Sequence, residues 1–259
     1  MLTATFLHAS GVGPATERRI WEQSILHWED FLSGHERVKL SPVQHATLLD
    51  TIPKSLESLQ AHDHRFFADV VPPKEHWRAY DVFGHRAAFV DIETTGMGTD
   101  DPITVIGLYN GREMKHFVRD HNMQDFADEV RQYSMLVTFF GTVFDLPRIK
   151  GRFPSLRLDQ LHVDLCFSMR RLGMKGGLKC VEEMLGLERS QETKGLSGWD
   201  AVRLWYEYQR GSEEALQLLL RYNEEDVVHL KALMDYTYDA LRKRCIESVG
   251  CWNADRPGG

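Results

Sequence analysis

Apolar and polar positions divide the chain into a helical first part and a later part in which strands and helices alternate. In the first part, helical spacing predicts helices at Pro14–Glu22, Trp28–Leu32 and Ser55–Phe67. Pro42 and Pro53 are predicted to interrupt this region, and Pro72 and Pro73 to form the linker that ends it. These patterns predict a small helical domain over residues 1–80.

From Ala87 the pattern changes to β-branched and apolar runs. Strands are predicted at Ala87–Glu93, Ile103–Tyr109, Glu113–Val118, Met135–Phe140 and Leu161–Asp164. Asn110-Gly111 favours a two-residue hairpin, so the first three strands are expected to form an antiparallel meander. Helices are predicted at Gln124–Tyr133, from Asp145, and at Leu165–Leu172, Leu178–Leu185, Trp199–Gln209 and Glu213–Arg244. This order predicts an α/β fold with a mixed sheet flanked by helices over residues 85–245, followed by a flexible tail over 246–259.

Composition narrows the class of protein. The chain has 259 residues, of which 42% are hydrophobic, and no apolar run approaches the roughly 20 residues that cross a bilayer. The segment Met1–Phe6 does not resemble a secretory signal, so we expect a cytoplasmic protein without membrane association. The four cysteines form no CxxC pair and are expected to be buried, reduced thiols rather than zinc or iron–sulfur ligands. Oligomeric state is left open.

The net charge of −7 disfavours a protein that coats nucleic acid by charge alone, because such binding needs Lys and Arg to neutralise phosphates. It is compatible with an acidic metal site, where bound cations cancel the negative charge.

Asp91 and Glu93 end an apolar strand, separated by one residue. The two-residue period of a strand places both side chains on one face. The two acids repel each other there, and a divalent cation would give both a partner. The alternative is a solvated strand end with two incidental acids.

Two further acids, Asp145 and Asp226, occur in contexts that suit a metal site, and a third, Asp164, is left outside the ligand set. Asp145 follows a strand and a glycine turn and opens a helix, where it could also act as a helix N-cap. Tyr222 and Asp226 are four residues apart on a predicted helix and so share one face, although a surface tyrosine on an acidic helix is the alternative. Asp164 could border the same site or cap the helix that begins at Leu165.

The order of these motifs resembles the DEDD exonucleases of the ribonuclease-H-like superfamily, tyrosine subgroup. That family carries Asp-x-Glu on its first strand, an acid after a later strand, and Tyr-x-x-x-Asp on a late helix. The segments Val90–Gly96, Gly177–Glu182 and Tyr222–Val227 are also similar to a bacterial branch of predicted exonucleases. The resemblance covers about residues 85–242. One departure is Phe140, which stands where the family usually has Asn.

The resemblance implies a 3'→5' exonuclease of DNA or RNA. Asp91, Glu93, Asp145 and Asp226 would hold two divalent cations, with Asp91 bridging them, and Tyr222 would orient the attacking water. Ligands that are all oxygen suit Mg²⁺ or Mn²⁺. The direction of digestion rests on the resemblance alone.

Nucleic-acid contacts are predicted in two further places. Gly11 and Gly13 precede a helix, as in a helix-hairpin-helix module that binds phosphate through backbone N–H groups, although an ordinary turn between helices is equally compatible. Basic residues that could guide a strand near the metal site are Arg148, Lys150, Arg152, Arg170, Arg171, Lys175 and Lys179.

Two alternatives to an exonuclease stay open. A catalytically silent nucleic-acid-binding protein with the same fold is favoured by Phe140 and disfavoured by the complete set of four acids. A ribonuclease-H-like endonuclease or strand-transfer enzyme would be expected to lack the late Tyr-x-x-x-Asp motif, so Tyr222 disfavours it.

Overall fold

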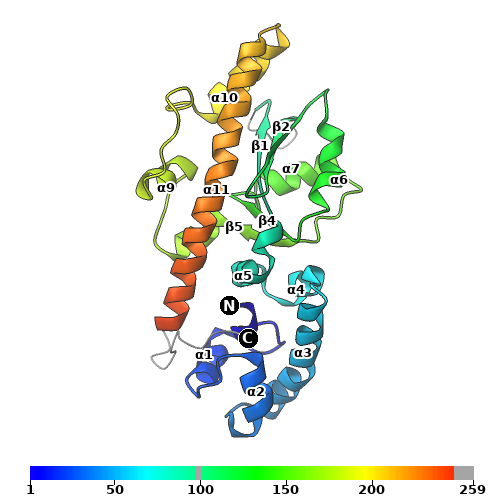
Figure 1. Ribbon diagram of the computed structural model, residues 1–259, viewed down its shortest axis with the longest axis vertical. Coiled ribbons are helices and arrows are strands. Elements are labelled where there is room, and N and C mark those ends of the chain that lie inside the picture. Colours follow the sequence, from blue (N-terminus) through cyan, green and yellow to red (C-terminus); the bar gives the residue numbers. More distant parts are fainter. Residues whose placement is uncertain (97, 99–100, 248–259) are drawn as a thin grey trace.

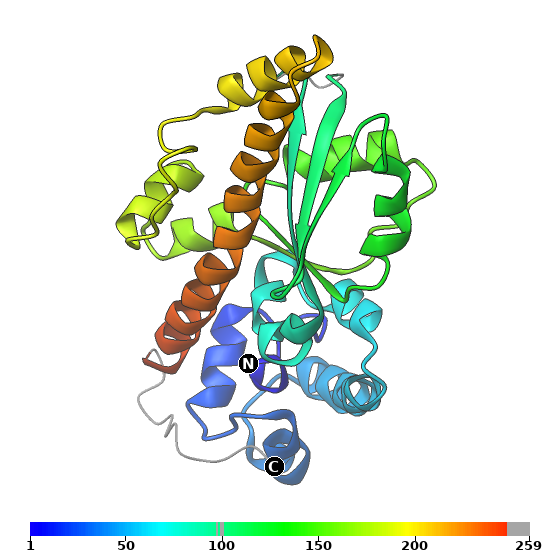
Figure 2. The same ribbon diagram turned by 45° about the horizontal axis from the view of Figure 1, so that its top comes forward.

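The computed structural model describes residues 1–96, 98 and 101–247. The N-terminal helices form one end of the molecule and the sheet with its flanking helices forms the other (Figure 1). The last helix, α11, runs along the sheet and continues beside the N-terminal part (Figures 1 and 2). This helix ends at Glu247, so the predicted tail falls almost wholly outside the described residues.

The helices and strands follow the predicted order closely. The α-helices are α1 (Pro14–Trp21), α2 (Trp28–Gly34), α3 (Pro42–Gln60), α4 (His64–Val70), α5 (Tyr80–Phe83), α6 (Phe126–Val130), α7 (Asp145–Arg152), α8 (Leu165–Arg171), α9 (Leu178–Met184), α10 (Gly198–Gln209) and α11 (Glu213–Glu247). The 3-10 helices are η1 (Leu2–Ala4), η2 (His35–Arg37), η3 (Pro73–Ala79), η4 (Gly84–Arg86) and η5 (Met123–Asp125). The strands are β1 (Ala87–Thr94), β2 (Ile103–Tyr109), β3 (Met114–Val118), β4 (Met135–Thr138) and β5 (Leu161–Asp164).

The N-terminal part corrects the predicted helix boundaries. Pro42 starts α3 behind the capping residue Ser41, but Pro53 lies inside the same helix, so the interruption predicted there was wrong. Burial of Leu48 and Ile52 on the preceding turns offsets the backbone hydrogen bond that a proline removes. The helix predicted over 55–67 is in fact divided, because Asp63 accepts hydrogen bonds from the first N–H groups of α4.

The predicted linker at Pro72 and Pro73 is part of the packed structure. Pro73 begins η3, which lies beside β5 and whose residues from Glu75 to Ala79 are buried. The hydrophobic cluster of the N-terminal helices continues into the sheet through Trp77, Ala87 and Phe89. The two parts of the chain therefore share one core.

The sheet has the strand order β3-β2-β1-β4-β5. The pairs β1–β2 and β2–β3 are antiparallel, which confirms the meander, and β1–β4 and β4–β5 are parallel. The two-residue hairpin prediction was wrong: Tyr109 pairs with Met114, which leaves a loop of residues 110–113. The Asn110 side chain accepts hydrogen bonds from the backbone N–H groups of Arg112 and Glu113, so it closes the wider turn itself.

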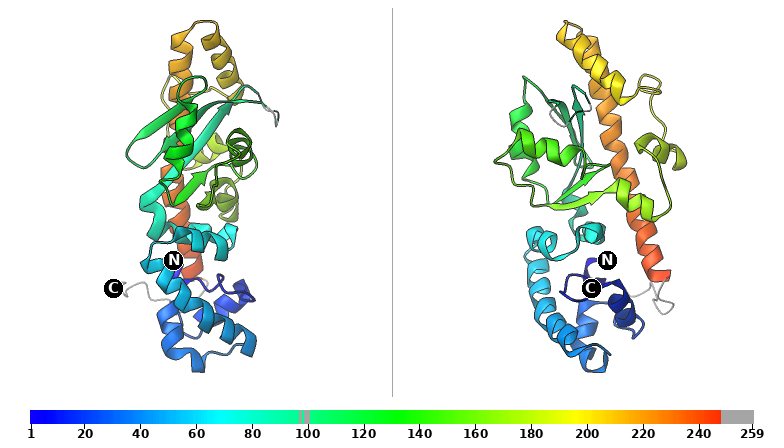
Figure 3. Two further views of the ribbon diagram at one scale, coloured as in Figure 1. Left: turned by 90° about the vertical axis from the view of Figure 1, so that its right-hand side faces the viewer. Right: turned by 180° about the vertical axis from the view of Figure 1, so that it is seen from behind.

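Helices cover both faces of the sheet (Figures 2 and 3). Helices α6 and α7 pack on one face, over Ala88, Val90 and Ile92 of β1. Helix α11 packs on the other face, where residues 87 and 89 of β1 point. The same alternation directs Asp91 and Glu93 toward α11.

Within the described residues, no helix combines the length and the apolar character needed to span a bilayer. Cys166, Cys180 and Cys245 are free thiols. The prediction of buried cysteines is correct for Cys166 and wrong for Cys180, which is exposed; Cys245 is half-buried, and Cys251 lies outside the described residues.

Candidate metal centre

Three of the predicted carboxylates converge between β1 and α11. Asp91 and Glu93 project from the same face of β1, and Asp226 projects from α11. One ligand oxygen from each of the three lies within 4.8 Å of the others. Tyr222, one helical turn before Asp226, is buried and lines the same pocket.

A glycine on β2 lets α11 approach the sheet this closely. Gly107 pairs with Asp91 across the antiparallel register, and a Cβ atom at Gly107 would lie 2.0 Å from Oδ1 of Asn223 and 2.8 Å from Cγ2 of Val227. Asn223 in turn donates a hydrogen bond of 3.1 Å from its amide to Oδ2 of Asp91. Sequence reasoning missed this positioning role of Asn223, although the residue adjoins Tyr222 in the recognised motif.

Asp145 completes the acidic lining from the other side of β1. It is the first residue of α7, and its Oδ1 accepts a hydrogen bond of 3.2 Å from the backbone N–H of Ile92. Its carboxylate therefore faces β1. Asp145 is not the N-cap of α7, because that position is occupied by Phe144. Asp91, Glu93, Asp145, Tyr222 and Asp226 all line one pocket of about 280 Å³.

Burial opposes ionisation of all four acids, and repulsion between neighbouring carboxylates adds to this effect for Asp91 and Glu93. Burial raises the pKa of Asp91 and Glu93 well above the usual range, and the neighbouring carboxylates raise both further. Burial raises the pKa of Asp145 to about 7 and that of Asp226 to about 6. A divalent cation would relieve this electrostatic cost, and oxygen ligands of this kind suit Mg²⁺ or Mn²⁺. The residues therefore fit a divalent metal centre.

A cationic side chain that sequence reasoning missed borders the carboxylates. Arg189 donates to Oδ1 of Asp226 and, through two hydrogen bonds of 2.7 Å, to both oxygens of Glu182. His229 contacts the same Glu182 carboxylate at 2.9 Å. Glu182 belongs to the Gly177–Glu182 segment of the family resemblance, but Arg189 lies in the loop after α9, where no local pattern marks it.

Asp164 organises the turn that follows β4. Its carboxylate accepts hydrogen bonds of 2.9 Å from the backbone N–H of Phe140 and 3.0 Å from that of Thr142. It also caps α8 by accepting from the N–H of Cys166 at 3.1 Å. The capping alternative for Asp164 is therefore confirmed.

The predicted nucleic-acid contacts lie in two separate places. Gly13 is the N-cap of α1 and Gly11 has a φ of 78°, so both belong to the N-terminal part and not to the metal pocket. Arg148 lies near the carboxylates: its guanidinium stacks 3.7 Å above the ring of Phe144 and donates to the carbonyl of Gly98 at 2.8 Å.

Comparison with known proteins identifies two to which parts of this chain are similar. The uncharacterized protein YprB of Bacillus subtilis (strain 168) is 32% identical over 169 residues, which is 56% of this chain; the chain spans only 40% of that relative. The family B DNA polymerase of the hyperthermophilic archaeon Pyrobaculum calidifontis has a similar structure over 61% of this chain and 24% of its own, with a TM-score of 0.46 and 17% identity.

A protein-family model matches most of the sheet and its flanking helices. The RNase H superfamily model matches residues 88–238, which include β1 with its acids and α11 with Tyr222 and Asp226. This chain therefore belongs to the RNase H superfamily.

Proposed function

We propose that the protein is a metal-dependent 3'→5' exonuclease that hydrolyses phosphodiester bonds of DNA or RNA with two Mg²⁺ or Mn²⁺ ions. The convergence of Asp91, Glu93 and Asp226 within 4.8 Å carries the proposal. Membership of the RNase H superfamily and the tyrosine-type order of motifs support it.

Each acid has a role that its position supports. Asp91, on which the charges of Asp145, Asp226 and Glu93 all act, would help to hold both ions, with Glu93 and Asp226 completing one site and Asp145 supporting the second. Divalent cations held by these residues would supply charge neutralisation at the attacking and leaving oxygens of the phosphodiester displacement. Asn223 holds Asp91 and the Ile92 backbone holds Asp145, so both carboxylates are oriented before substrate arrives.

Tyr222 acts in its protonated form. Burial and the neighbouring carboxylates of Asp226 and Glu93 raise its pKa well above the usual range, so the hydroxyl keeps its proton at neutral pH. It therefore orients the attacking water by hydrogen bonding and does not act as the base. The ammonium of Lys179 lies 4.9 Å from the Tyr222 ring, where it supplies positive charge for a phosphate.

The test uses the full chain, freed of metal by chelation and then supplied with Mg²⁺ or Mn²⁺. Single- and double-stranded DNA and RNA carry the label on the 5' end in one set and on the 3' end in another. The Asp226→Asn variant removes a ligand charge. Glu224→Gln is the matched control, because Glu224 lies two residues away on the exposed side of α11.

A 3'→5' exonuclease gives a ladder from the 5' label and mononucleotides from the 3' label, with activity lost in Asp226→Asn and kept in Glu224→Gln. Internal cuts would replace the exonuclease with an endonuclease. If the protein binds these nucleic acids but cleaves none of them with either metal, the catalytically silent binding protein would be favoured. Equal cleavage by both variants would place the active site elsewhere.

A further inference from the structure

Two phenylalanines are exposed beside the metal pocket. Phe140, which lines the pocket, is 39% exposed, and Phe167 on α8 is 40% exposed. Their ring centroids lie 6.2 Å apart with the planes tilted by 44°. The guanidinium of Arg170 lies 5.5 Å from the Phe167 ring. The pair therefore presents aromatic surface and positive charge together at the edge of the site.

The position of this aromatic pair requires an unfavourable backbone conformation at Phe140. Phe140 has a φ of 65°, in the left-handed region that Asn and Gly tolerate and Phe does not favour. Asp164 stabilises both halves of the pair, because it binds the Phe140 N–H and caps the helix that carries Phe167. Since Phe140 is not part of the core, packing does not explain why a bulky ring is kept in a strained position.

A basic path continues from the aromatic pair. Phe167 lines a second pocket of about 260 Å³ together with Lys74, Trp77 and Arg171. Lys74 and Arg171 also line a third pocket of about 590 Å³, which reaches α1 and the last turns of α11. The path thus leads from the carboxyl ends of β1, β4 and β5 along η3 to the N-terminal helices.

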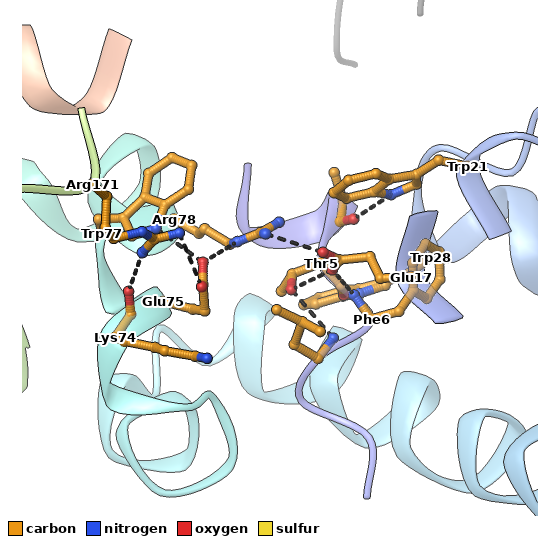
Figure 4. A network of polar contacts seen from close by, with 12 residues as sticks. Thr5, Phe6, Glu17, Trp21, Trp28, Lys74, Glu75, Trp77, Arg78 and Arg171 are labelled. Carbon is orange, nitrogen blue, oxygen red and sulfur yellow. Dashed lines mark hydrogen bonds and ion pairs between the residues drawn. The ribbon is translucent and has the colours of Figure 1, made fainter. Parts of the chain in front are cut away.

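The third pocket has more basic than acidic side chains. Arg18, Lys74, Arg78, Arg171 and Arg244 line it, against Glu17 and Glu75. Figure 4 shows Arg78 lying between the two acids, to which it donates hydrogen bonds of 3.0 and 2.9 Å. Glu75 also accepts from Arg171 at 3.1 Å. These ion pairs neutralise both acids, so the side chains that line the third pocket carry a net positive charge, although the whole chain has a net charge of −7.

We propose that this path binds a single strand of nucleic acid whose 3' end lies in the metal centre. Bases stack on Phe140 and Phe167, and the phosphates upstream follow Lys74, Arg171 and the residues of the third pocket. A single strand exposes its base faces to aromatic side chains and its backbone to a basic groove, whereas paired bases in a duplex cover each other. Pro14 lines the third pocket, so the turn at Gly11 and Gly13 lies at the far end of the path. The proposal rests on the proposed function and assigns it a single-stranded substrate.

Binding is measured without cleavage, by fluorescence anisotropy of a labelled oligothymidylate with Ca²⁺ in place of the active metal. Phe140→Ala and Phe167→Ala are each expected to weaken binding about fivefold or more, the effect of losing one stacked base. Phe167→Trp keeps a stacking surface and should bind like the wild type. Tyr236→Ala is the control, since Tyr236 is 42% exposed on α11 and lines none of the three pockets.

The basic part of the path is tested by salt dependence. Lys74→Ala and Arg18→Ala should each reduce the slope of log affinity against log salt by about 0.7. Arg131→Ala is the control, because Arg131 pairs with Asp128 next to α6 and lines none of the three pockets. Unchanged slopes in the Lys74 and Arg18 variants would overturn the basic part of the path.

A small substrate separates this proposal from the proposed function. The p-nitrophenyl ester of thymidine 5'-monophosphate reaches the metal centre but is too short for the path. If the wild type hydrolyses the ester, and the two phenylalanine variants bind the oligonucleotide like the wild type, the path is wrong and the exonuclease stands. If the wild type hydrolyses neither the ester nor the oligonucleotide, but the two phenylalanine variants bind the oligonucleotide more weakly, the proposed binding path is supported and the proposed exonuclease activity is rejected. Tighter binding of duplex than of single strand would overturn the path.

Discussion

Arg189 forms an ion pair with Asp226, and both side chains are almost completely buried, at 6% and 10% exposed. One of the three converging carboxylates therefore has a cationic partner within the protein. Glu182 fixes the guanidinium by two parallel hydrogen bonds, so Arg189 cannot swing away without breaking them. A metal ion at Asp226 must share that carboxylate with Arg189.

Replacing Arg189 with Ala should destabilise the metal-free protein by about 3 kcal/mol, because Asp226 would be left buried without its cationic partner and Glu182 would keep only the contact with His229. Mn²⁺ should restore part of this loss, since it neutralises Asp226. Chemical denaturation with and without Mn²⁺ measures both effects. Arg221→Ala, which breaks an exposed pair with Glu192, is the control and should cost less than about 1 kcal/mol. A loss that Mn²⁺ leaves unchanged would argue against a metal at Asp226.

Stability of the metal-free protein should fall as pH rises from about 4 to about 7. The pKa of Asp145 is raised from 3.8 to about 7 and that of Asp226 to about 6, so the folded state binds protons that the unfolded state has already released. Thermal melting in the presence of a chelator measures this trend. Added Mg²⁺ should stabilise the protein more at pH 8 than at pH 5.5, because at the lower pH it competes with protons. A metal effect independent of pH would contradict the assignment of these carboxylates.

Phe140→Asn should stabilise the fold while weakening the binding of single strands. Asn tolerates a φ of 65° better than Phe, which is worth about 1 kcal/mol and raises the melting temperature by about 2–4 °C. The same change removes a ring from the proposed stacking surface. Calorimetry and anisotropy on the same sample report both effects, and parallel loss of stability and binding would mean that Phe140 is structural.

Gly107→Ala should loosen the metal centre from a distance. Its methyl group would clash with Asn223 and Val227 and push α11 away from β1, at a cost of about 1–3 kcal/mol. Mn²⁺ affinity, measured by titration calorimetry, should fall because Asp226 moves with the helix. Gly151→Ala on α7 is the control: its methyl group meets no atom within 4 Å and should leave the affinity unchanged. Wild-type affinity in the Gly107 variant would show that the close approach is not needed.

Local spacing predicted the parts of the site that one element carries by itself. The two-residue period of β1 placed Asp91 and Glu93 on one face, and the four-residue spacing on α11 placed Tyr222 beside Asp226. The strand ending at Asp164 was predicted with its observed bounds. These features depend on backbone geometry that neighbouring residues determine.

Features that depend on contacts between distant segments escaped prediction. Arg189 meets Asp226 across 37 positions of sequence, and no periodicity connects them. The orientation of Asp145 depends on the backbone of Ile92, 53 positions earlier. Pro53 was expected to break the helix because the sequence does not show that Leu48 and Ile52 of the same helix are buried. The turn at Asn110 is wider than predicted because the Asn110 side chain accepts hydrogen bonds from the N–H groups of Arg112 and Glu113.

Helix α11 is a single uninterrupted rod of 35 residues, about 50 Å long at the rise of an α-helix. Its first half carries Tyr222 and Asp226. Its second half contacts the N-terminal part, where Asp235 accepts a hydrogen bond of 2.6 Å from Tyr80, and Arg244 near its end donates to the carbonyl of Arg171 at the end of α8. Because an α-helix resists bending, a displacement of α11 near Arg244 would also move Tyr222 and Asp226. The helix thus couples the position of the N-terminal part mechanically to the carboxylates.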